Sequence, residues 1–131
     1  MDDQPNLRSP LGRVRGLGSA KDGTGHWWAQ RLTALALIPL TVWFVGTVVS
    51  LIGADYTAVA AWIASPVVAG LLVLLIIATF YHAVLGLQVV IEDYVHHEGA
   101  KIALLLFVKA LAIVLALSAV LSVLTLLFTR A

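Results

Sequence analysis

The stretch PVVAGLLVLLIIATFYHAVLGLQVVIEDYVHH, residues 66–97, decides the fold of this chain. From Pro66 to Ile91 it is almost continuously apolar, and about 20 such residues let an α-helix cross the hydrocarbon core of a bilayer. Proline is well tolerated in the first turn of a helix. The run has no polar face of the kind that a helix on the surface of a soluble protein needs. The stretch therefore predicts a transmembrane helix over residues 66–91.

Two more apolar runs lie on either side of it, at about residues 32–52 and 102–128. The chain has 131 residues, of which 61% are hydrophobic, with eight Lys and Arg and seven Asp and Glu. Between residues 32 and 91 the single charged residue is Asp55. This composition excludes a water-soluble monomer. It predicts an all-α membrane protein in which residues 27–131 form three transmembrane helices, as part of a larger heteromeric helix bundle.

The charge and cysteine content exclude other classes of protein. The chain has no cysteine, which excludes disulfides, iron-sulfur ligation and thiol zinc sites. A formal net charge of +1 gives no electrostatic reason to expect binding to nucleic acid.

The basic residues predict the orientation in the membrane. Those before the first span are Arg8, Arg13, Arg15, Lys21 and Arg31. The segment 53–65, which joins the first two spans, has no Lys or Arg. We therefore expect residues 1–26 to form a cytoplasmic segment and the C-terminus to face the periplasm. Because residues 1–26 are Gly-rich and contain Asp, no cleaved signal peptide is expected.

His82 is the residue whose placement in the hydrocarbon core is the least favourable, because it lies well inside the second predicted span. An imidazole at that depth needs a partner. One interpretation is a neutral ring that hydrogen-bonds a neighbouring helix, and the other is a ligand of haem iron. Ala78 and Gly86 stand four residues before and after it, so one helix face carries an imidazole between two small residues. That face suits either a flat macrocycle or close helix packing.

A six-coordinate haem with two histidine ligands requires a second chain. The other three histidines, His26, His96 and His97, map to the predicted cytoplasmic boundary. This chain therefore offers one axial ligand, and a copy of the chain or a different subunit has to offer the other.

The residues Glu92, Asp93 and Tyr94 close the second predicted span at the cytoplasmic interface. Acidic side chains at a helix C-terminus oppose the helix dipole, so they are either solvated, paired with a cation or used chemically. A tyrosine hydroxyl can donate to a carbonyl oxygen. The cluster is either an interfacial anchor or a site at which a lipid-soluble carbonyl compound is bound and protonated.

Arg31, Lys109 and Pro39 can each be explained by a structural role in a membrane helix. Arg31 either reaches lipid phosphates or, if His82 binds a haem, pairs with a propionate, helped by His26. Lys109 is expected to extend back to the cytoplasmic interface. Pro39 is expected to kink the first helix.

Two segments resemble a known family: SAKDGTGHWWAQRLTALAL, residues 19–37, and HAVLGLQVVIEDYVHH, residues 82–97. Together with the three spans, they are similar to the small hydrophobic membrane anchor subunit of bacterial succinate dehydrogenase (respiratory complex II), alphaproteobacterial type. In that family a histidine is followed 11 and 12 residues later by an Asp-Tyr pair. His82, Asp93 and Tyr94 have this spacing.

The resemblance implies a role for each matching residue. It implies that His82 is an axial ligand of haem b iron, which is shared with a second anchor subunit, and that Arg31 and His26 lie near a propionate. It implies that Tyr94 hydrogen-bonds ubiquinone beside the acidic Asp93. The implied partners are the second anchor subunit, an iron-sulfur subunit and a flavoprotein subunit, in the bacterial inner membrane.

In such a complex this chain performs no catalytic step alone, since the flavoprotein oxidises succinate. Two alternatives stay open from the residues. One is an anchor of a fumarate reductase or another quinone-linked b-type cytochrome, and the other is a structural membrane bundle without a cofactor.

Overall fold

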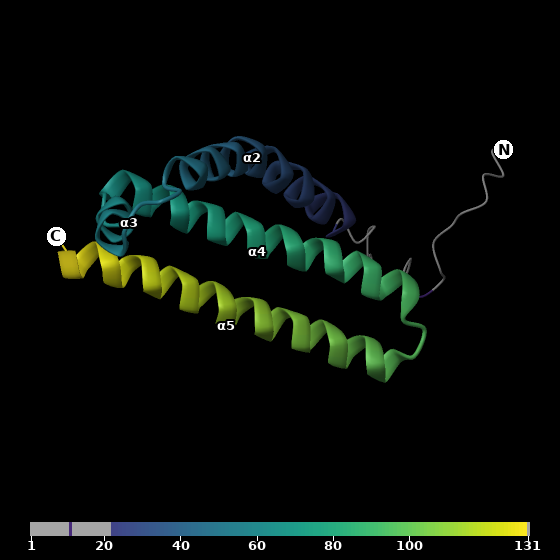
Figure 1. Ribbon diagram of the computed structural model, residues 1–131. Helices are drawn as coiled ribbons and strands as arrows, with labels where there is room; N and C mark the ends of the chain where they lie inside the picture. Colours follow the sequence, from purple (N-terminus) through teal and green to yellow (C-terminus); the bar gives the residue numbers. More distant parts are fainter. Residues whose placement is uncertain (1–10, 12–21, 131) are drawn as a thin grey trace.

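The computed structural model describes Leu11 and residues 22–130, and within these ranges it contains helices and no strand (Figure 1). The four helices are α2 (Asp22–Ser50), α3 (Tyr56–Ile63), α4 (Pro66–Tyr94) and α5 (Glu98–Arg130). The all-α fold class with three long apolar helices is therefore confirmed. The basic residues Arg8, Arg13, Arg15 and Lys21, used above to predict orientation, lie outside the described residues.

Helix α2 begins at Asp22, so residues 22–31, which precede the first predicted span, are helical as well. Figure 1 shows α2 bowed along its length, in agreement with the bend expected at Pro39 inside the helix. Two threonines on this helix, Thr33 and Thr47, donate their hydroxyls to the backbone carbonyls four residues earlier, each at 2.7 Å. These bonds satisfy hydroxyl groups that hydrocarbon cannot solvate.

A short helix, α3, follows the end of α2 and was not expected from the sequence. Gly53, with φ +84°, turns the chain in a left-handed conformation that glycine adopts without strain. Asp55 then caps α3, because its carboxylate accepts the backbone N–H of Ala58 at 2.8 Å. The segment 53–65, predicted as the connection between the first two spans, therefore contains a short helix that leads into α4.

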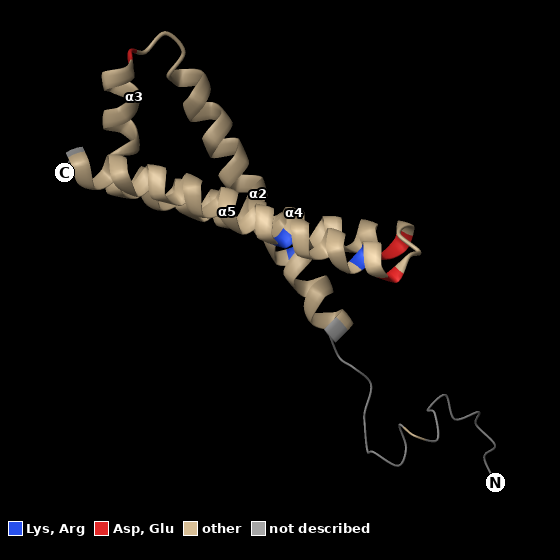
Figure 2. Cartoon of the chain, turned by 90° about the horizontal axis from the view of Figure 1, so that it is seen from below, with Lys and Arg blue, Asp and Glu red and all other residues tan. Residues whose placement is uncertain are grey.

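Helix α4 lies between α2 and α5, and within the described residues α2 and α5 do not approach each other closely (Figures 1 and 2). It begins at Pro66, as predicted, and runs to Tyr94. Figure 2 shows α2 crossing α4 obliquely, so that its C-terminal half diverges from α4 and α3 closes the space.

A small apolar core fills the end of the bundle at which α3 lies. Its buried members are Ala69 and Leu72 of α4 and Val123 of α5. Trp43 of α2 stacks on Trp62 of α3 with ring centroids 6.1 Å apart, and both pack against this core. The stacked rings therefore join the diverging half of α2 to the rest of the bundle.

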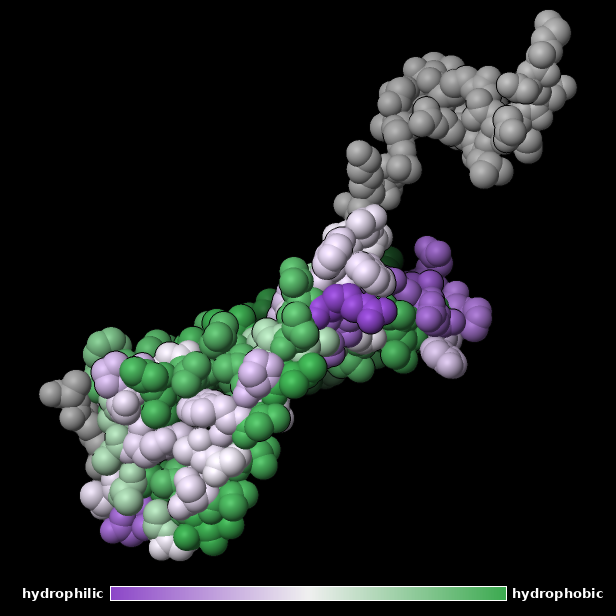
Figure 3. Space-filling model, turned by 90° about the horizontal axis from the view of Figure 1, so that it is seen from above, coloured by the Kyte–Doolittle hydropathy of each residue, from purple (hydrophilic) through white to green (hydrophobic). Residues whose placement is uncertain are grey.

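Most of the apolar surface is not covered by the chain itself. Three helices, Gly23–Ser50, Pro66–Tyr94 and Glu98–Thr129, are long and apolar enough to cross a membrane. Figure 3 shows most of the hydrophilic residues at one end of the molecule and a smaller hydrophilic spot at the other, with hydrophobic and intermediate residues between them. Such an exposed surface requires lipid or other protein chains around it.

Candidate functional site

His82 faces α2 and is held from both sides of its ring. Its Nδ1 lies 2.9 Å from Thr33 Oγ1, and its Nε2 lies 3.4 Å from the side-chain nitrogen of Gln30. The ring is half-buried between the two helices. These contacts are the ones expected if His82 is a neutral ring that hydrogen-bonds a neighbouring helix, the first of its two interpretations.

The hydrogen bonds of Thr33 favour one tautomer of this ring. The hydroxyl has a single proton, and its shortest contact is the backbone carbonyl of Ala29, at 2.7 Å. A hydroxyl that donates there must accept from His82, so Nδ1 carries the imidazole proton. Nε2 then has a free lone pair, to which the amide of Gln30 can donate. An Nε2 lone pair is also the form that binds a metal ion.

Gln30 and Thr33 are the two residues of this site that the sequence analysis missed. Together with His26 they lie three and four residues apart, which places them on one face of α2. The polar face that His26, Gln30 and Thr33 form on the first turns of an otherwise apolar helix is the pattern that could have predicted them. Two buried atoms of this face, His26 Nε2 and Gln30 Oε1, have no hydrogen-bond partner among the described residues.

Small residues of α4 allow α2 to approach His82. Ala78 is buried in the bundle. A Cβ atom added to Gly86 would lie 3.6 Å from the side-chain nitrogen of Gln30. The helix face that carries Ala78, His82 and Gly86 therefore packs against α2, and the side chain of Gln30 lies over the space that Gly86 leaves.

His26 lines a cavity of about 400 Å³ between the beginning of α2 and the end of α4. Gly23 lines the same cavity from α2, and Gln88, Val89 and Glu92 line it from α4. The amide of Gln88 donates to the carboxylate of Glu92 at 2.8 Å. Glu92, for which no separate role was predicted, is therefore brought to the same cavity as His26.

Asp93, Tyr94 and Arg31 are not joined to His82. Tyr94, at the last residue of α4, is 78% exposed, and Asp93 beside it is exposed as well. The guanidinium of Arg31 lies 5.0 Å from the centre of the Trp27 ring, a cation–π contact. Among the residues that the structure describes, no hydrogen bond joins any of the three to His82. Their predicted roles depend on groups outside this chain.

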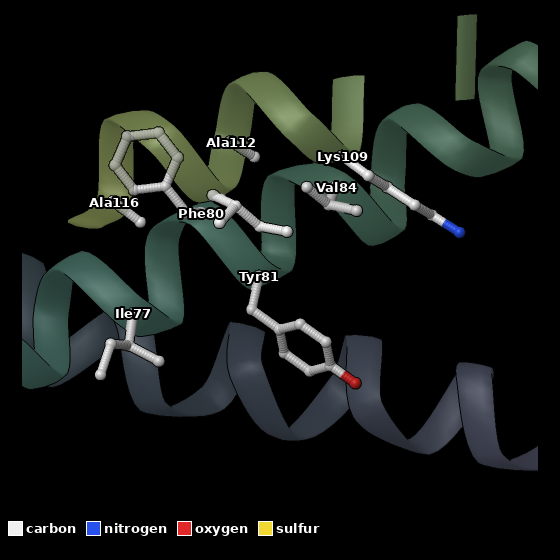
Figure 4. A pocket seen from close by; sticks show the side chains of 8 residues that line it. Ile77, Phe80, Tyr81, Val84, Lys109, Ala112 and Ala116 are labelled. Atoms are coloured by element: carbon white, nitrogen blue, oxygen red, sulfur yellow. The ribbon is translucent and has the colours of Figure 1, made fainter. Parts of the chain in front are cut away.

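Lys109 lines an apolar groove of about 390 Å³ between α4 and α5. Figure 4 shows its side chain extending from α5 past Val84, along the direction in which α4 runs toward its C-terminal end. That is the end expected to face the cytoplasm, as predicted for a lysine that reaches an interface. The phenol of Tyr81 lies on the α2 side of the groove.

The donor set of the chain fits one kind of metal site and not others. Among residues 22–130, no three His, Cys, Asp or Glu side chains gather closely enough to hold a bare metal ion. A haem needs from each protein ligand a single imidazole, because the macrocycle supplies the other four donors. His82, with Nδ1 protonated and Nε2 directed at a weak contact, fits that requirement.

The fold and the site define a helical membrane protein with a histidine held between two of its spans. The family of succinate dehydrogenase/fumarate reductase transmembrane subunits matches residues 5–126 of the chain. The chain belongs to this family, which confirms the resemblance that was based on residues 19–37 and 82–97.

Named relatives agree with the family. The chain is 32% identical over 108 residues to a succinate dehydrogenase hydrophobic membrane anchor subunit of Rickettsia bellii, covering 82% of this chain and 86% of that protein. It is 33% identical over 97 residues to the subunit of the same name from Paracoccus denitrificans, covering 74% of this chain and 75% of that protein. No solved structure matches the chain.

Proposed function

We propose that this chain is a membrane anchor subunit of succinate:ubiquinone oxidoreductase. In this role it ligates haem b through His82, together with a partner anchor subunit, and contributes to the ubiquinone reduction site. The observation that carries the proposal is a histidine inside a helix long and apolar enough to cross a membrane, with a Thr33 contact at Nδ1 that favours a lone pair on Nε2. Relatives that are named succinate dehydrogenase anchor subunits support the choice of complex.

The haem proposal requires His82 Nε2 to become accessible. The contact that now covers Nε2 is long, at 3.4 Å, compared with a usual distance of about 2.9–3.0 Å for an amide hydrogen bond. The Gln30 side chain can therefore leave it at low cost. When bound, the haem supplies one-electron redox chemistry at the level of His82. Arg31 and His26, at the predicted cytoplasmic end, are the residues that we propose for its propionates.

The quinone proposal rests on the end of α4. Tyr94 and Asp93 are exposed there, so they are free to line a pocket completed by other subunits. The phenol of Tyr94 can donate to a quinone carbonyl oxygen, and Asp93 can exchange protons with the aqueous phase. Their position at a predicted cytoplasmic boundary suits a reaction in which quinone takes up two electrons and two protons to form quinol.

The uncovered apolar surface supports the proposed partners. We propose that residues 27–131 pack against the second anchor subunit and lipid, and that residues 1–26 and the turn between α4 and α5 face the iron-sulfur and flavoprotein subunits. This places the chain in the bacterial inner membrane with its N-terminus in the cytoplasm and its C-terminus in the periplasm. The chain then docks the soluble subunits and takes part in quinone reduction without performing a step alone.

A fumarate reductase anchor is the second candidate, because the matching family includes both enzymes. Turnover of the purified complex with quinone and succinate, compared with quinol and fumarate, separates the two. Faster fumarate reduction would contradict the first candidate.

The experiment that tests haem ligation is His82→Ala in the complex purified through a tag on this chain. We expect the b-type absorption band and the haem in a pyridine haemochrome assay to be lost, because the chain has no second histidine at that depth. His97→Ala is the control, since His97 is exposed in the turn before α5 and should leave the band unchanged. A normal band in the assembled His82→Ala complex would disprove the assignment and favour a bundle without a cofactor.

Tyr94→Phe tests the quinone site. It removes the hydroxyl and keeps the ring, so we expect quinone reduction to fall by about 10²-fold or more, as for a positioned proton donor. Succinate oxidation with a soluble artificial acceptor should persist. Equal loss of both activities would show that Tyr94 serves assembly instead. Tyr81→Phe, inside the span, is the matched control and should retain both activities.

A further inference from the structure

The two α2 side chains that contact His82 are chemically unlike and touch opposite sides of its ring. Thr33 Oγ1 lies 2.9 Å from Nδ1, a good hydrogen-bond distance. The amide nitrogen of Gln30 lies 3.4 Å from Nε2, which is a weak contact. If His82 binds iron through Nε2, as proposed above, Thr33 should strengthen the bond to iron and Gln30 should compete with it.

Thr33 is itself fixed by its own helix. Its hydroxyl reaches the carbonyl of Ala29 at 2.7 Å and that of Gln30 at 3.1 Å, so two acceptors compete for its one proton. The lone pair that remains on Oγ1 is directed at Nδ1. An acceptor at Nδ1–H fixes the tautomer and the plane of a ligating imidazole and raises its basicity.

Gln30 is held far less well. The oxygen of its side-chain amide, Oε1, is buried without a hydrogen-bond partner among the described residues, which is energetically unfavourable. Its amide nitrogen makes the long contact to Nε2 and lies 3.6 Å from the position of a Cβ on Gly86. A side chain with a poor contact and an unpaired oxygen is easily displaced by a ligand that bonds Nε2 strongly.

We infer that Thr33 is a positioning residue for the iron ligand His82, and that Gln30 competes with haem for Nε2. This inference rests on the proposed function and extends it to two residues outside the proposed ligand and quinone sites. Thr33 then strengthens ligation and sets the haem potential, and Gln30 weakens the initial uptake of haem.

The direction of the effect on the potential follows from the hydrogen bond. An imidazole whose N–H is accepted by an oxygen donates more electron density to iron, which stabilises the ferric form. The midpoint potential of the haem is therefore lower with the Thr33 hydroxyl than without it.

The test measures haem occupancy and midpoint potential in the purified complex with Thr33→Val, which keeps the shape and removes the hydroxyl. We expect haem affinity to fall about 10- to 100-fold, as when the outer partner of a metal ligand is lost. We also expect the midpoint potential to shift to more positive values. Thr33→Ala removes the same hydroxyl and should give the same direction if the valine variant does not assemble. Thr33→Ser restores the hydroxyl and should restore the potential.

Thr47→Val is the matched control. Thr47 makes the same 2.7 Å bond to a carbonyl four residues earlier on α2, that of Trp43, and lies far along the helix from His82. Its substitution should leave occupancy and potential unchanged. A wild-type potential in both Thr33→Val and Thr33→Ala, or an equal shift in Thr47→Val, would overturn the role of Thr33.

Gln30→Ala has the opposite expected effect. It removes the group that covers Nε2, so haem occupancy should rise above wild type when complexes are formed at limiting haem. Occupancy at or below wild type would overturn the role of Gln30. The proposed function is wrong if the His82→Ala complex retains the haem. If His82→Ala loses the haem but the Thr33 and Gln30 variants behave as wild type, only the roles of Thr33 and Gln30 are wrong.

Discussion

The two ends of the bundle are held together by different forces. Near α3, apolar side chains from four helices pack together around Ala69, which is 1% exposed, and Trp43 stacks on Trp62. Around His82, the contacts that reach the ring come from α2, and they are made by the polar side chains of Gln30 and Thr33. One end is closed by apolar packing within the chain, and the other has an imidazole with a weakly covered ring nitrogen.

The difference suggests that the α3 end of the chain carries its stability and the His82 end carries its function. Apolar packing at the α3 end needs no further partner, so it can fix how α2, α3, α4 and α5 are arranged. Two buried side-chain atoms on the polar face of α2, Gln30 Oε1 and His26 Nε2, have no hydrogen-bond partner among the described residues. Buried polar atoms without a partner are costly, and a bound ligand or partner chain that supplies a hydrogen bond would remove this cost. The His82 end is therefore the one that should respond to ligand and partner subunits.

The largest effect is expected for Gly86→Phe, which places a large ring where Gln30 approaches α4. The overpacked interface should push α2 from α4, cost about 1–3 kcal/mol and remove most of the haem. Gly86→Ala is the control, because its Cβ would make an ordinary contact at 3.6 Å and should leave haem content close to wild type. Haem content of the purified complex is the measurement. Normal haem in Gly86→Phe would show that α2 need not lie close to His82.

A smaller effect, on stability alone, is expected for Ala69→Leu at the other end. Ala69 is closely surrounded, so the added atoms should lower the free energy of unfolding by about 1–3 kcal/mol. Thermal unfolding in detergent, followed by circular dichroism, measures it. Val67→Leu, at a position 73% exposed, is the control and should unfold as wild type. Loss of haem at temperatures where Ala69→Leu is folded would contradict the separation of the two ends.

The three long helices could be predicted from the sequence because long apolar runs have few other solutions in a bilayer. The start of α4 at Pro66 was predicted correctly, whereas the first span was expected to begin at residue 32 and α2 starts at Asp22. Hydropathy predicts which residues lie in the hydrocarbon core. The helix itself is longer, because its backbone hydrogen bonds continue into the polar turns that flank the core. Helix α3 was missed because eight residues between two turns give too short a pattern.

The candidate site was only partly predictable. His82 was found because a polar group at membrane depth is informative by itself. Its neighbours Gln30 and Thr33 were missed, because each is an ordinary residue in a helix until a histidine from another helix lies beside it. The roles of Asp93, Tyr94, Arg31 and His26 stay predictions, since each depends on a haem or a quinone outside the chain.

The sequence by itself determined that the chain is a bundle of apolar helices with one histidine at membrane depth, since hydropathy and spacing are local properties. The tertiary structure decided which face of α4 meets α2, and with it the contacts that the two ring nitrogens of His82 make with Thr33 and Gln30. Those features depend on distances between residues about 50 positions apart in the chain, which only the packing of one helix on another can fix.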